Sequence, residues 1–277
     1  MRASSVIHTD PRKAHDSYLR SHYTLPMCLL SFHWQPDSQT PLTLVANRDE
    51  FHHRPARAAQ FWPEYPHVLA GKDLSAGGTW LGVTTHGYFA ALTNVRQLPA
   101  PYKGIISRGE LVLDFLKDEP DPASYLANIH QHADQYDGFN LIVGNRQACW
   151  YYSNRHASEP QALPAGLYGL SNAALDTPWP KLKAAKSHLQ EWLTADTDSA
   201  ALLHSLLQDR QTYPIALQPD TGVGQPWETL LSSAFIVSQE YGTRASTGLQ
   251  IHQQGIHFQE ASYDKAGHTD NLVTFDI

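Results

Sequence analysis

The sequence has little cysteine and methionine and no long hydrophobic run, and each scarcity excludes a class of protein. Two Cys among 277 residues cannot build a disulfide framework, which favours a reducing compartment such as the cytoplasm. No stretch approaches the roughly 18 apolar residues that a transmembrane helix needs, so we expect no membrane span. A formal net charge of −7 argues against nucleic acid as a partner, because phosphate binding needs a basic surface.

Residues 1–26 differ in character from the rest of the chain. They contain four basic and two acidic residues and no continuous apolar segment, so they do not resemble a secretory signal. Their net charge of +2 leaves −9 for residues 27–277. We expect residues 1–26 to be an N-terminal extension outside the fold, or a mis-assigned start. We expect residues 27–277 to form a single domain with a substantial core.

The dipeptide Met27-Cys28 joins one of the two Met to one of the two Cys at the start of the first strand-like run. Such an adjacency has a probability of about 1 % by chance at this composition. We expect Met27 to be the functional start or residues 1–26 to be removed. An initiator Met is trimmed when a small residue such as Cys follows, and Cys28 would then carry a free α-amine. The alternative is a mixed tail followed by a coincidental pair.

Hydrophobic patterns predict an α+β fold with strands near both ends and helices grouped between them. A hairpin is expected at His86-Gly87, and an extended loop around Phe61-Trp62. A capping box at Ser107 and Glu110 predicts a helix start. Further helices are predicted at 122–132, from Pro180 and at 199–207. Strands are predicted at 28–33, 42–46, 68–70, 79–85, 88–93, 139–143, 148–152, 234–238, 248–252, 256–260 and 272–275.

Cys28 is the first candidate for chemistry. The thiolate is the nucleophilic form of cysteine, and the α-amine of an N-terminal Cys lies close enough to act as its base. The alternative is a small buried hydrophobe at a strand start, as most free Cys are. Cys149 lies within an apolar strand pattern and is expected in the core.

The run Asn47-Arg48-Asp49-Glu50 follows an apolar strand directly. Arg48 is suited to lowering the pKa of a nearby thiol, and Asp49 to holding an ammonium group. Antiparallel pairing of strands 28–33 and 42–46 would bring Cys28 beside Asp49. The alternative is a solvated turn, as most charge runs are.

Two Asn and one Arg complete the polar candidates. Asn94 and Asn172 each follow an apolar run, where an amide can donate to a developing oxyanion, although Asn also favours turns. Arg244 lies between two predicted strands, and its alternative is a surface Arg. The 16 His form no haem-attachment or metal-ligand motif, so we expect no metal site.

These residues belong to a series of ordered motifs that resembles a known family. The motifs are Met27-Cys28, Ala46-Asn47-Arg48-Asp49-Glu50-Phe51, Arg54-Pro55, Gly77-Gly78-Thr79-Trp80-Leu81-Gly82, Ala91-Leu92-Thr93-Asn94, Arg108-Gly109-Glu110-Leu111, Gly138-Phe139-Asn140-Leu141, Tyr168-Gly169-Leu170-Ser171-Asn172, Thr177-Pro178-Trp179 and Tyr241-Gly242-Thr243-Arg244. Together they resemble the NRDE family, also called the transport and Golgi organisation family. Members of that family begin at Met-Cys, so residues 1–26 are a departure.

The resemblance implies a four-layer αββα sandwich like that of the N-terminal-nucleophile hydrolases. By the more distant likeness to cysteine amidases of the choloylglycine-hydrolase and penicillin-acylase group, Cys28 would be the nucleophile and Asp49 would orient it. Asn94 and Asn172 would shape the oxyanion pocket, and Arg244 would support the thiolate.

The same resemblance implies substrate contacts from the polar run and from the tryptophan of the glycine-rich motif. The residues expected to make them are Asn47, Arg48, Glu50 and Trp80. One departure is Ala46, which stands where that group usually has an Arg. Either Arg48 substitutes for it, or the site is not a competent amidase.

Two function hypotheses follow, with no resident cofactor in either. The first is a thiol hydrolase of an amide or related acyl bond in a small molecule. The second is a non-catalytic binder or chaperone that mobilises haem, or an acyl-lipid metabolite, in the same cleft, where haem would be cargo. Its weakness is that no His, Cys or Tyr cluster indicates an axial ligand. A third possibility is a scaffold that kept the fold and lost the chemistry.

Overall fold

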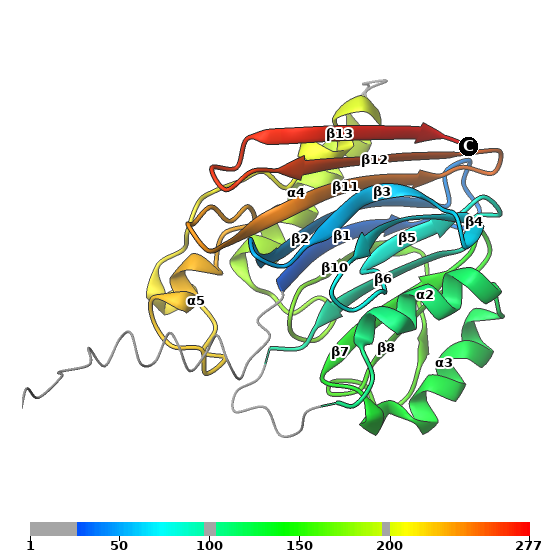
Figure 1. Cartoon of the computed structure of the whole chain (residues 1–277), viewed down its shortest axis with the longest axis horizontal. Helices are drawn as coiled ribbons and strands as arrows, with labels where there is room; N and C mark the ends of the chain where they lie inside the picture. The colour runs from blue at the N-terminus through cyan, green and yellow to red at the C-terminus, as the bar shows by residue number, and fades with distance from the viewer. Residues whose placement is uncertain (1–26, 97–103, 196–199) are drawn as a thin grey trace, which may run out of the picture.

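The computed structural model describes residues 27–96, 104–195 and 200–277 (Figure 1). Within these ranges the strands form two antiparallel sheets, one of six strands and one of seven. None of the helices in the same ranges is long and apolar enough to cross a bilayer. The predicted extension, residues 1–26, lies outside the described residues.

The elements of the described chain follow in spatial order for each sheet. The six-stranded sheet consists of β10 (Gly166–Leu170), β1 (Met27–Trp34), β2 (Leu42–Phe51), β11 (Tyr241–Ile251), β12 (Ile256–Tyr263) and β13 (Thr269–Asp276). The seven-stranded sheet consists of β3 (Ala56–Trp62), β4 (Tyr65–Asp73), β5 (Leu81–Thr84), β6 (Phe89–Asn94), β7 (Phe139–Gly144), β8 (Cys149–Ser153) and β9 (Gln161–Ala162). The helices are α2 (Arg108–Asp118), α3 (Pro122–Gln131), α4 (Pro180–Thr194) and α5 (Trp227–Leu230), with 3₁₀ helices η1 (Ala133–Gln135), η2 (Ala200–Ser205) and η3 (Ile215–Leu217).

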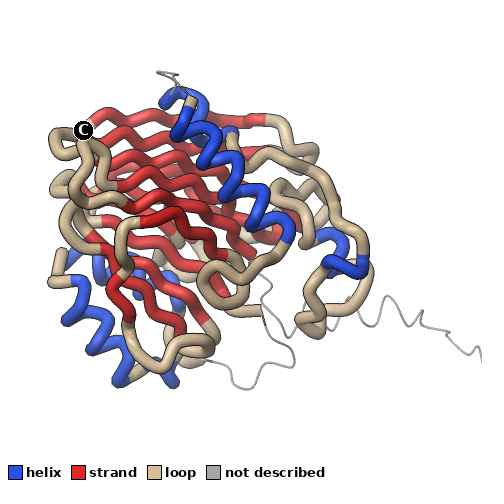
Figure 2. Tube along the Cα trace, turned by 180° about the vertical axis from the view of Figure 1, so that it is seen from behind, coloured by secondary structure: helices blue, strands red, loops and turns tan. Residues whose placement is uncertain are grey.

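Hydrophobic cores fill the spaces between the layers of the described chain. The largest core lies between the two sheets, where Phe32 and Leu44 of one sheet pack with Val83 and Phe89 of the other. A second core packs α2 and α3 on the outer face of the seven-stranded sheet. A third packs α4 on the outer face of the six-stranded sheet, and Figure 2 shows this helix lying across the strands. The predicted α+β fold with four αββα layers is therefore confirmed.

The alternation of side chains along β1 explains this layering. Leu30 and Phe32 belong to the core between the sheets, whereas Leu29 belongs to the core under α4. Successive residues of a strand point to opposite faces, so a strand that is covered on both faces is apolar at nearly every position. The predicted hairpin is also present, because β5 and β6 pair across a turn in which Gly87 has a φ of 87°.

Two predictions of element type are wrong. Phe61 and Trp62 lie in β3 rather than in an extended loop. The neighbouring prolines do not prevent this strand, because Pro55 and Pro63 lie just before its first and just after its last residue. Segment 234–238 is not a strand. Its backbone bonds to loops and side chains instead: the Phe235 amide donates to the Asp209 carbonyl and the Ile236 amide to the Thr243 hydroxyl.

Two helix predictions are corrected in detail. Segment 199–207 contains the 3₁₀ helix η2 rather than an α-helix, and Ser199 itself lies outside the described residues. Ser107 is the N-cap of α2, but its side chain makes no capping hydrogen bond. The capping-box pattern therefore placed the helix correctly without supplying the interaction that usually explains it.

Asn47 anchors segment 234–238 and the chain after η2 to the middle of β2. Its side-chain nitrogen donates to the carbonyls of Leu207 and Ala234, at 2.8 Å each. Its side-chain oxygen accepts a hydrogen bond of 2.6 Å from the Ser246 hydroxyl of β11. Asn47 is 1 % exposed, so these hydrogen bonds are made away from water. The residue therefore holds irregular chain against the sheet.

We expect Asn47→Ala to lower the free energy of unfolding by about 2–4 kcal/mol, because it leaves two carbonyls and a hydroxyl buried without partners. Chemical denaturation measures this change. Asn128→Ala, at an exposed position of α3, is the matched control and should stay within about 0.5 kcal/mol of the parent. Unchanged stability with weakened ligand binding would instead support the substrate contact expected from the sequence.

Candidate active site

A cavity of about 90 Å³ lies between the two sheets at the start of β1. Five of the residues singled out in the sequence line it. They are Cys28, Arg48, Glu50, Trp80 and Asn94. Strands from both sheets and the N-terminal end of α2 contribute to the walls, so the site exists only once the two sheets have packed together.

The register of β1 and β2 brings Cys28 to the acidic run of the sequence. The two strands are antiparallel, with Met27 opposite Asp49 and Cys28 opposite Arg48. Cys28 is an even-numbered residue of β1, like Leu30 and the others that face the space between the sheets. The neighbourhood of Cys28 and Asp49 that strand pairing suggested is therefore present.

The environment of Cys28 favours the protonated thiol. Burial and the charge of Asp49 raise the pKa of the Cys28 thiol to about 12. Arg48 opposes this rise, as does the Asp49 backbone amide, which donates a hydrogen bond to the sulfur. With Met27 still attached, Cys28 is a neutral thiol at physiological pH.

Asp49 points to the face of β2 opposite the cavity and is fully buried. The Thr243 hydroxyl donates a hydrogen bond of 2.6 Å to its Oδ1, whereas its Oδ2 has no hydrogen-bond partner among the described residues. Burial raises the pKa of Asp49, and the charge of Lys181 acts against that rise. Asp49 thus has a buried acceptor atom beside the backbone of β1.

Lys181 on α4 is the cation that faces Asp49 from the helix layer. It is 2 % exposed, and its Nζ donates a hydrogen bond of 2.8 Å to the Leu231 carbonyl. Burial lowers the pKa of Lys181, and Asp49 is the largest of the charges that oppose this. Lys181 was not among the site residues predicted from the sequence, although its position on the helix was a usable signal. A lysine precedes Ala185 and Leu189 by four and eight residues, on the apolar face of the helix.

A group of charged side chains forms one wall of the cavity. Arg48 Nη2 lies 3.2 Å from Asp73 Oδ2 and 3.9 Å from Glu50 Oε2. Arg54 Nε lies 2.7 Å from the same Asp73 oxygen. Burial raises the pKa of Asp73, but the hydrogen bond and charge of Arg54 hold it below its usual value. The Trp80 ring lies 4.4 Å from Arg48 Cζ, so the guanidinium is stacked on an aromatic face.

The two predicted oxyanion residues occupy different positions. Asn94 ends β6 and lines the cavity. Asn172 is fully buried, and its Nδ2 donates a hydrogen bond of 2.8 Å to the Asn94 carbonyl. The Ser171 hydroxyl lies 3.1 Å from both Asn172 Oδ1 and the Cys28 carbonyl. Asn172 and Ser171 together therefore connect the backbones of Asn94 and Cys28.

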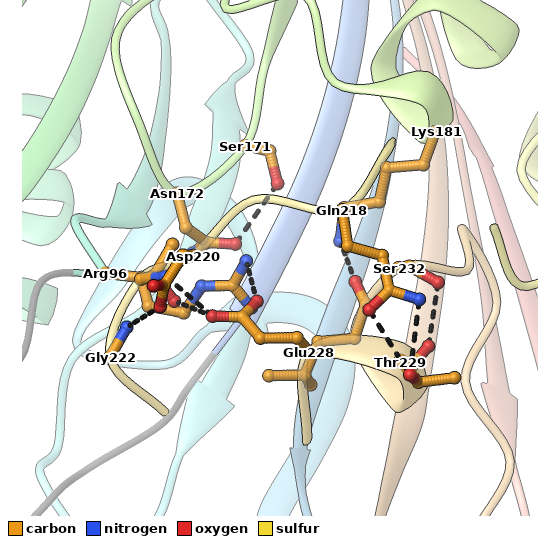
Figure 3. A network of polar contacts seen from close by, with 12 residues as sticks. Arg96, Ser171, Asn172, Lys181, Gln218, Asp220, Gly222, Glu228, Thr229 and Ser232 are labelled. Atoms are coloured by element: carbon orange, nitrogen blue, oxygen red, sulfur yellow. Dashed lines mark hydrogen bonds and ion pairs between the residues drawn. The ribbon is translucent and has the colours of Figure 1, made fainter. Parts of the chain in front are cut away.

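A buried ion pair supports Asn172 from the other side (Figure 3). Arg96 Nη2 lies 3.3 Å from Glu228 Oε2, and both side chains are at most 4 % exposed. The Arg96 backbone amide donates to the Asn172 carbonyl at 2.7 Å. The segment around α5 is thereby attached to the Asn residues of the site.

Besides Asp49 and Asn172, two more of the expected residues lie outside the cavity wall. Arg244 lies where the pairing of β11 with β2 shifts register, and its Nη1 is 3.4 Å and 3.2 Å from the carbonyls of Phe51 and His52. Asn47 points to the helix layer, as described above. Neither belongs to the described lining of the cavity.

Three further charged residues of the lining were not selected from the sequence, namely Arg54, Asp73 and Arg108. Arg54 and Arg108 lie in the ordered motifs, so motif membership was the available signal. In the described ranges no three His, Cys, Asp or Glu side chains are grouped closely enough to hold a metal ion. The arrangement offers a thiol, cationic donors and amide groups around one small space.

The chain is similar to one protein-family model and to several known proteins. Residues 27–265 match the family model described as Transport and Golgi organisation 2. The Bos taurus Transport and Golgi organization protein 2 homolog is 40 % identical over 258 residues, which covers 85 % of this chain and 93 % of that protein. The Homo sapiens homolog is 36 % identical over 257 residues, with the same coverage.

Among solved structures, a Caenorhabditis elegans N-acylethanolamine-hydrolyzing acid amidase ortholog aligns with a TM-score of 0.38 and 11 % identity. The alignment covers 80 % of this chain and 92 % of that chain. A score this low supports no argument about activity. The family model and the relatives, by contrast, match most of the sequence, and the match to the family model begins at Met27. The chain therefore belongs to the Transport and Golgi organisation 2 family.

Proposed function

We propose that the protein is a thiol amidohydrolase that cleaves an amide or related acyl bond of a small molecule, with Cys28 as nucleophile. The observation that carries the proposal is the position of Cys28. Its thiol lines a cavity between two sheets, and its backbone pairs with the strand that holds a buried, half-satisfied carboxylate. A merely structural cysteine needs neither feature.

Activation of the thiol requires removal of residues 1–27. In the uncut chain burial keeps the thiol protonated. Cleavage before Cys28 creates an α-ammonium group beside the Asp49 carboxylate, whose Oδ2 has no hydrogen-bond partner among the described residues. A cation next to the sulfur favours the thiolate, and the neutral amine is a base within reach of the thiol proton. Asp49 would hold and orient this amine.

The reaction then divides into two steps that share these groups. The sulfur attacks the substrate carbonyl while the α-amine takes the thiol proton, and the tetrahedral intermediate carries a negative oxygen. The C–N bond breaks, the α-ammonium protonates the departing amine, and a thioester remains. Water attacks the thioester with the α-amine as base, which releases a carboxylic acid and restores the thiol.

Asn94 is the side chain best placed to donate to the negative oxygen, because it lines the same cavity as Cys28. Asn172 would act through Asn94, since its own amide is held by the Asn94 carbonyl. Arg244 would act on the end of β2 rather than on the sulfur directly. Arg48, Glu50 and Trp80 supply the expected substrate contacts.

The alternative function, transport of haem or an acyl-lipid metabolite, finds no comparable support. The cavity of about 90 Å³ is smaller than the roughly 150 Å³ that accommodates benzene in a protein core. Among the described residues its lining contains no His or Tyr, and burial holds its one Cys as a neutral thiol rather than the thiolate that binds haem iron. Binding of a porphyrin in this cavity would require its walls to separate.

Replacement of the nucleophile tests the proposal. Cys28→Ala is expected to reduce hydrolysis of a small aliphatic N-acyl amide by at least about 1000-fold, because no other thiol lines the cavity. Cys149→Ala is the matched control and should retain the activity of the parent, since Cys149 lies in the core. Intact-mass spectrometry of the active protein should give a chain that begins at Cys28. Equal turnover by Cys28→Ala and the parent would refute the proposal.

The pH dependence of alkylation tests activation by cleavage. In the uncut chain the rate of Cys28 alkylation should rise about tenfold per pH unit throughout the range from about pH 7 to 10, because only the thiolate reacts and its pKa is raised to about 12. A protein expressed from Met27, with that Met removed, should level off at lower pH because the α-ammonium lowers the thiol pKa. Both are compared in a Cys149→Ser background. Identical profiles would contradict the proposed role of the amine.

A further inference from the structure

The walls of the cavity hold more guanidinium groups than carboxylates. Three guanidinium groups line it, those of Arg48, Arg54 and Arg108, against the two carboxylates of Glu50 and Asp73. Burial lowers the pKa of Arg108 only to about 10, so its side chain stays charged at neutral pH. Arg48 and Arg54 form ion pairs with these two carboxylates. Arg108 Nη1 donates a hydrogen bond of 2.9 Å to the Gly138 carbonyl, and Asp137, outside the lining, is the largest charge that opposes the lowering of its pKa.

The N-terminal end of α2 also contributes positive charge to the cavity. Ser107, Arg108 and Gly109 all line the cavity, and α2 has 11 residues. The first N–H groups of a helix have no partner within it and give that end a partial positive charge. Ser107 makes no side-chain capping hydrogen bond, and Glu110, the acidic residue of the first turn, is exposed and outside the lining.

Arg48 supplies an independent sign that an anion belongs here. Its side chain is 6 % exposed and lines the cavity. One nitrogen, Nη2, is committed to Asp73 and Glu50, whereas Nη1 is buried with no hydrogen-bond partner among the described residues. A buried guanidinium N–H without an acceptor is unfavourable, so the site lacks one acceptor oxygen.

We infer that this cavity selects substrates with a small anionic group, a carboxylate or a phosphate. Arg48, Arg108 and the first turn of α2 hold that group next to the carbonyl that Cys28 attacks. The inference rests on the proposed function and specifies its substrate class. Guanidinium groups form paired hydrogen bonds with carboxylates and with phosphates, and helix N-termini bind both kinds of anion. The size of the cavity limits the anionic part to a few heavy atoms.

Alkylation by a pair of nearly isosteric reagents tests the charge of the cavity without requiring catalysis. Iodoacetate is anionic and iodoacetamide is neutral. With either reagent the Cys28 sulfur displaces iodide, an S–C bond forms and the thiol proton passes to solvent. The measurement is the ratio of the two rates at Cys28 in a Cys149→Ser background, at low ionic strength. A small unstructured thiol such as N-acetylcysteine amide gives the reference ratio.

We expect iodoacetate to be favoured about tenfold more at Cys28 than at the reference thiol, because it places its carboxylate among the guanidinium groups. The preference should shrink as salt is added. A change in the thiol pKa alters both rates equally, so the ratio reports the attraction for the anion alone. A ratio equal to that of the reference thiol would overturn the inference.

A charge introduced at the helix N-terminus supplies a variant that should fold. Ser107→Asp and Ser107→Asn both place a favourable N-cap residue at this position, and they differ only in charge. Ser107→Asp is expected to lower the iodoacetate preference about fivefold, while Ser107→Asn stays near the parent. Thermal unfolding checks that both fold. Equal ratios for the two variants would show that the cavity does not sense anions.

A set of matched amides tests whether the anion site contributes to hydrolysis. The same set distinguishes a carboxylate from a phosphate as the preferred anion. The same short acyl chain is joined to glycine, to glycinamide and to aminomethylphosphonate. The inference expects the glycine or the phosphonate amide to have a kcat/KM at least about tenfold above that of the glycinamide amide. The larger of the two values shows whether the cavity takes a carboxylate or a phosphate. Preference for the neutral amide would overturn the inference. Absence of all turnover with an intact alkylation preference would reject the hydrolase and retain the anion site.

Discussion

The antiparallel pairing of β1 with β2 is the interaction on which the rest of the site depends. It places Cys28 opposite Arg48 and the backbone before Cys28 opposite Asp49. A slip of one residue would turn Cys28 away from the cavity and bring Leu29 to it. The register is secured by burial, because the two faces of β1 contribute to different hydrophobic cores. The position of the nucleophile is therefore a consequence of core packing.

The polar run of β2 is divided between the two faces of the sheet by the same alternation. Arg48 and Glu50 face the cavity, whereas Asn47 and Asp49 face the helix layer, where they meet Ser246 and Lys181. Four adjacent residues thus serve three purposes. Asn47 holds irregular chain in place, Asp49 presents a buried acceptor to the backbone of β1, and the other two define the charge of the cavity. Each charge of this run has an opposite charge nearby, since Arg48 lies beside Glu50 and Lys181 faces Asp49.

Sequence patterns were sufficient to predict the secondary structure of segments that contain local turn, cap or periodicity signals. The hairpin at Gly87 and the helices at Pro122 and Pro180 have local turn, cap and periodicity signals, and they are present as predicted. Segment 234–238 has no local turn, cap or periodicity signal of this kind. Its apolar residues resemble a strand, but its backbone hydrogen bonds go to distant groups such as Asn47. Residues with high strand propensity are those that pack well on a partly buried surface. A buried segment without regular structure is enriched in the same residues, so composition alone does not distinguish the two.

The sequence by itself determined the family, the layered α+β class and the residue types around Cys28. Only the tertiary structure decided which of them share one cavity. Arg54, Asp73 and Arg108 also line the cavity, and Lys181 faces Asp49. The predicted site residues Asn47, Asp49, Asn172 and Arg244 lie outside the cavity wall. The physical reason is that charge compensation acts through space. Partners from β2, β4, α2 and α4 are far apart along the chain, and only the packing of the two sheets and their helices brings them into contact.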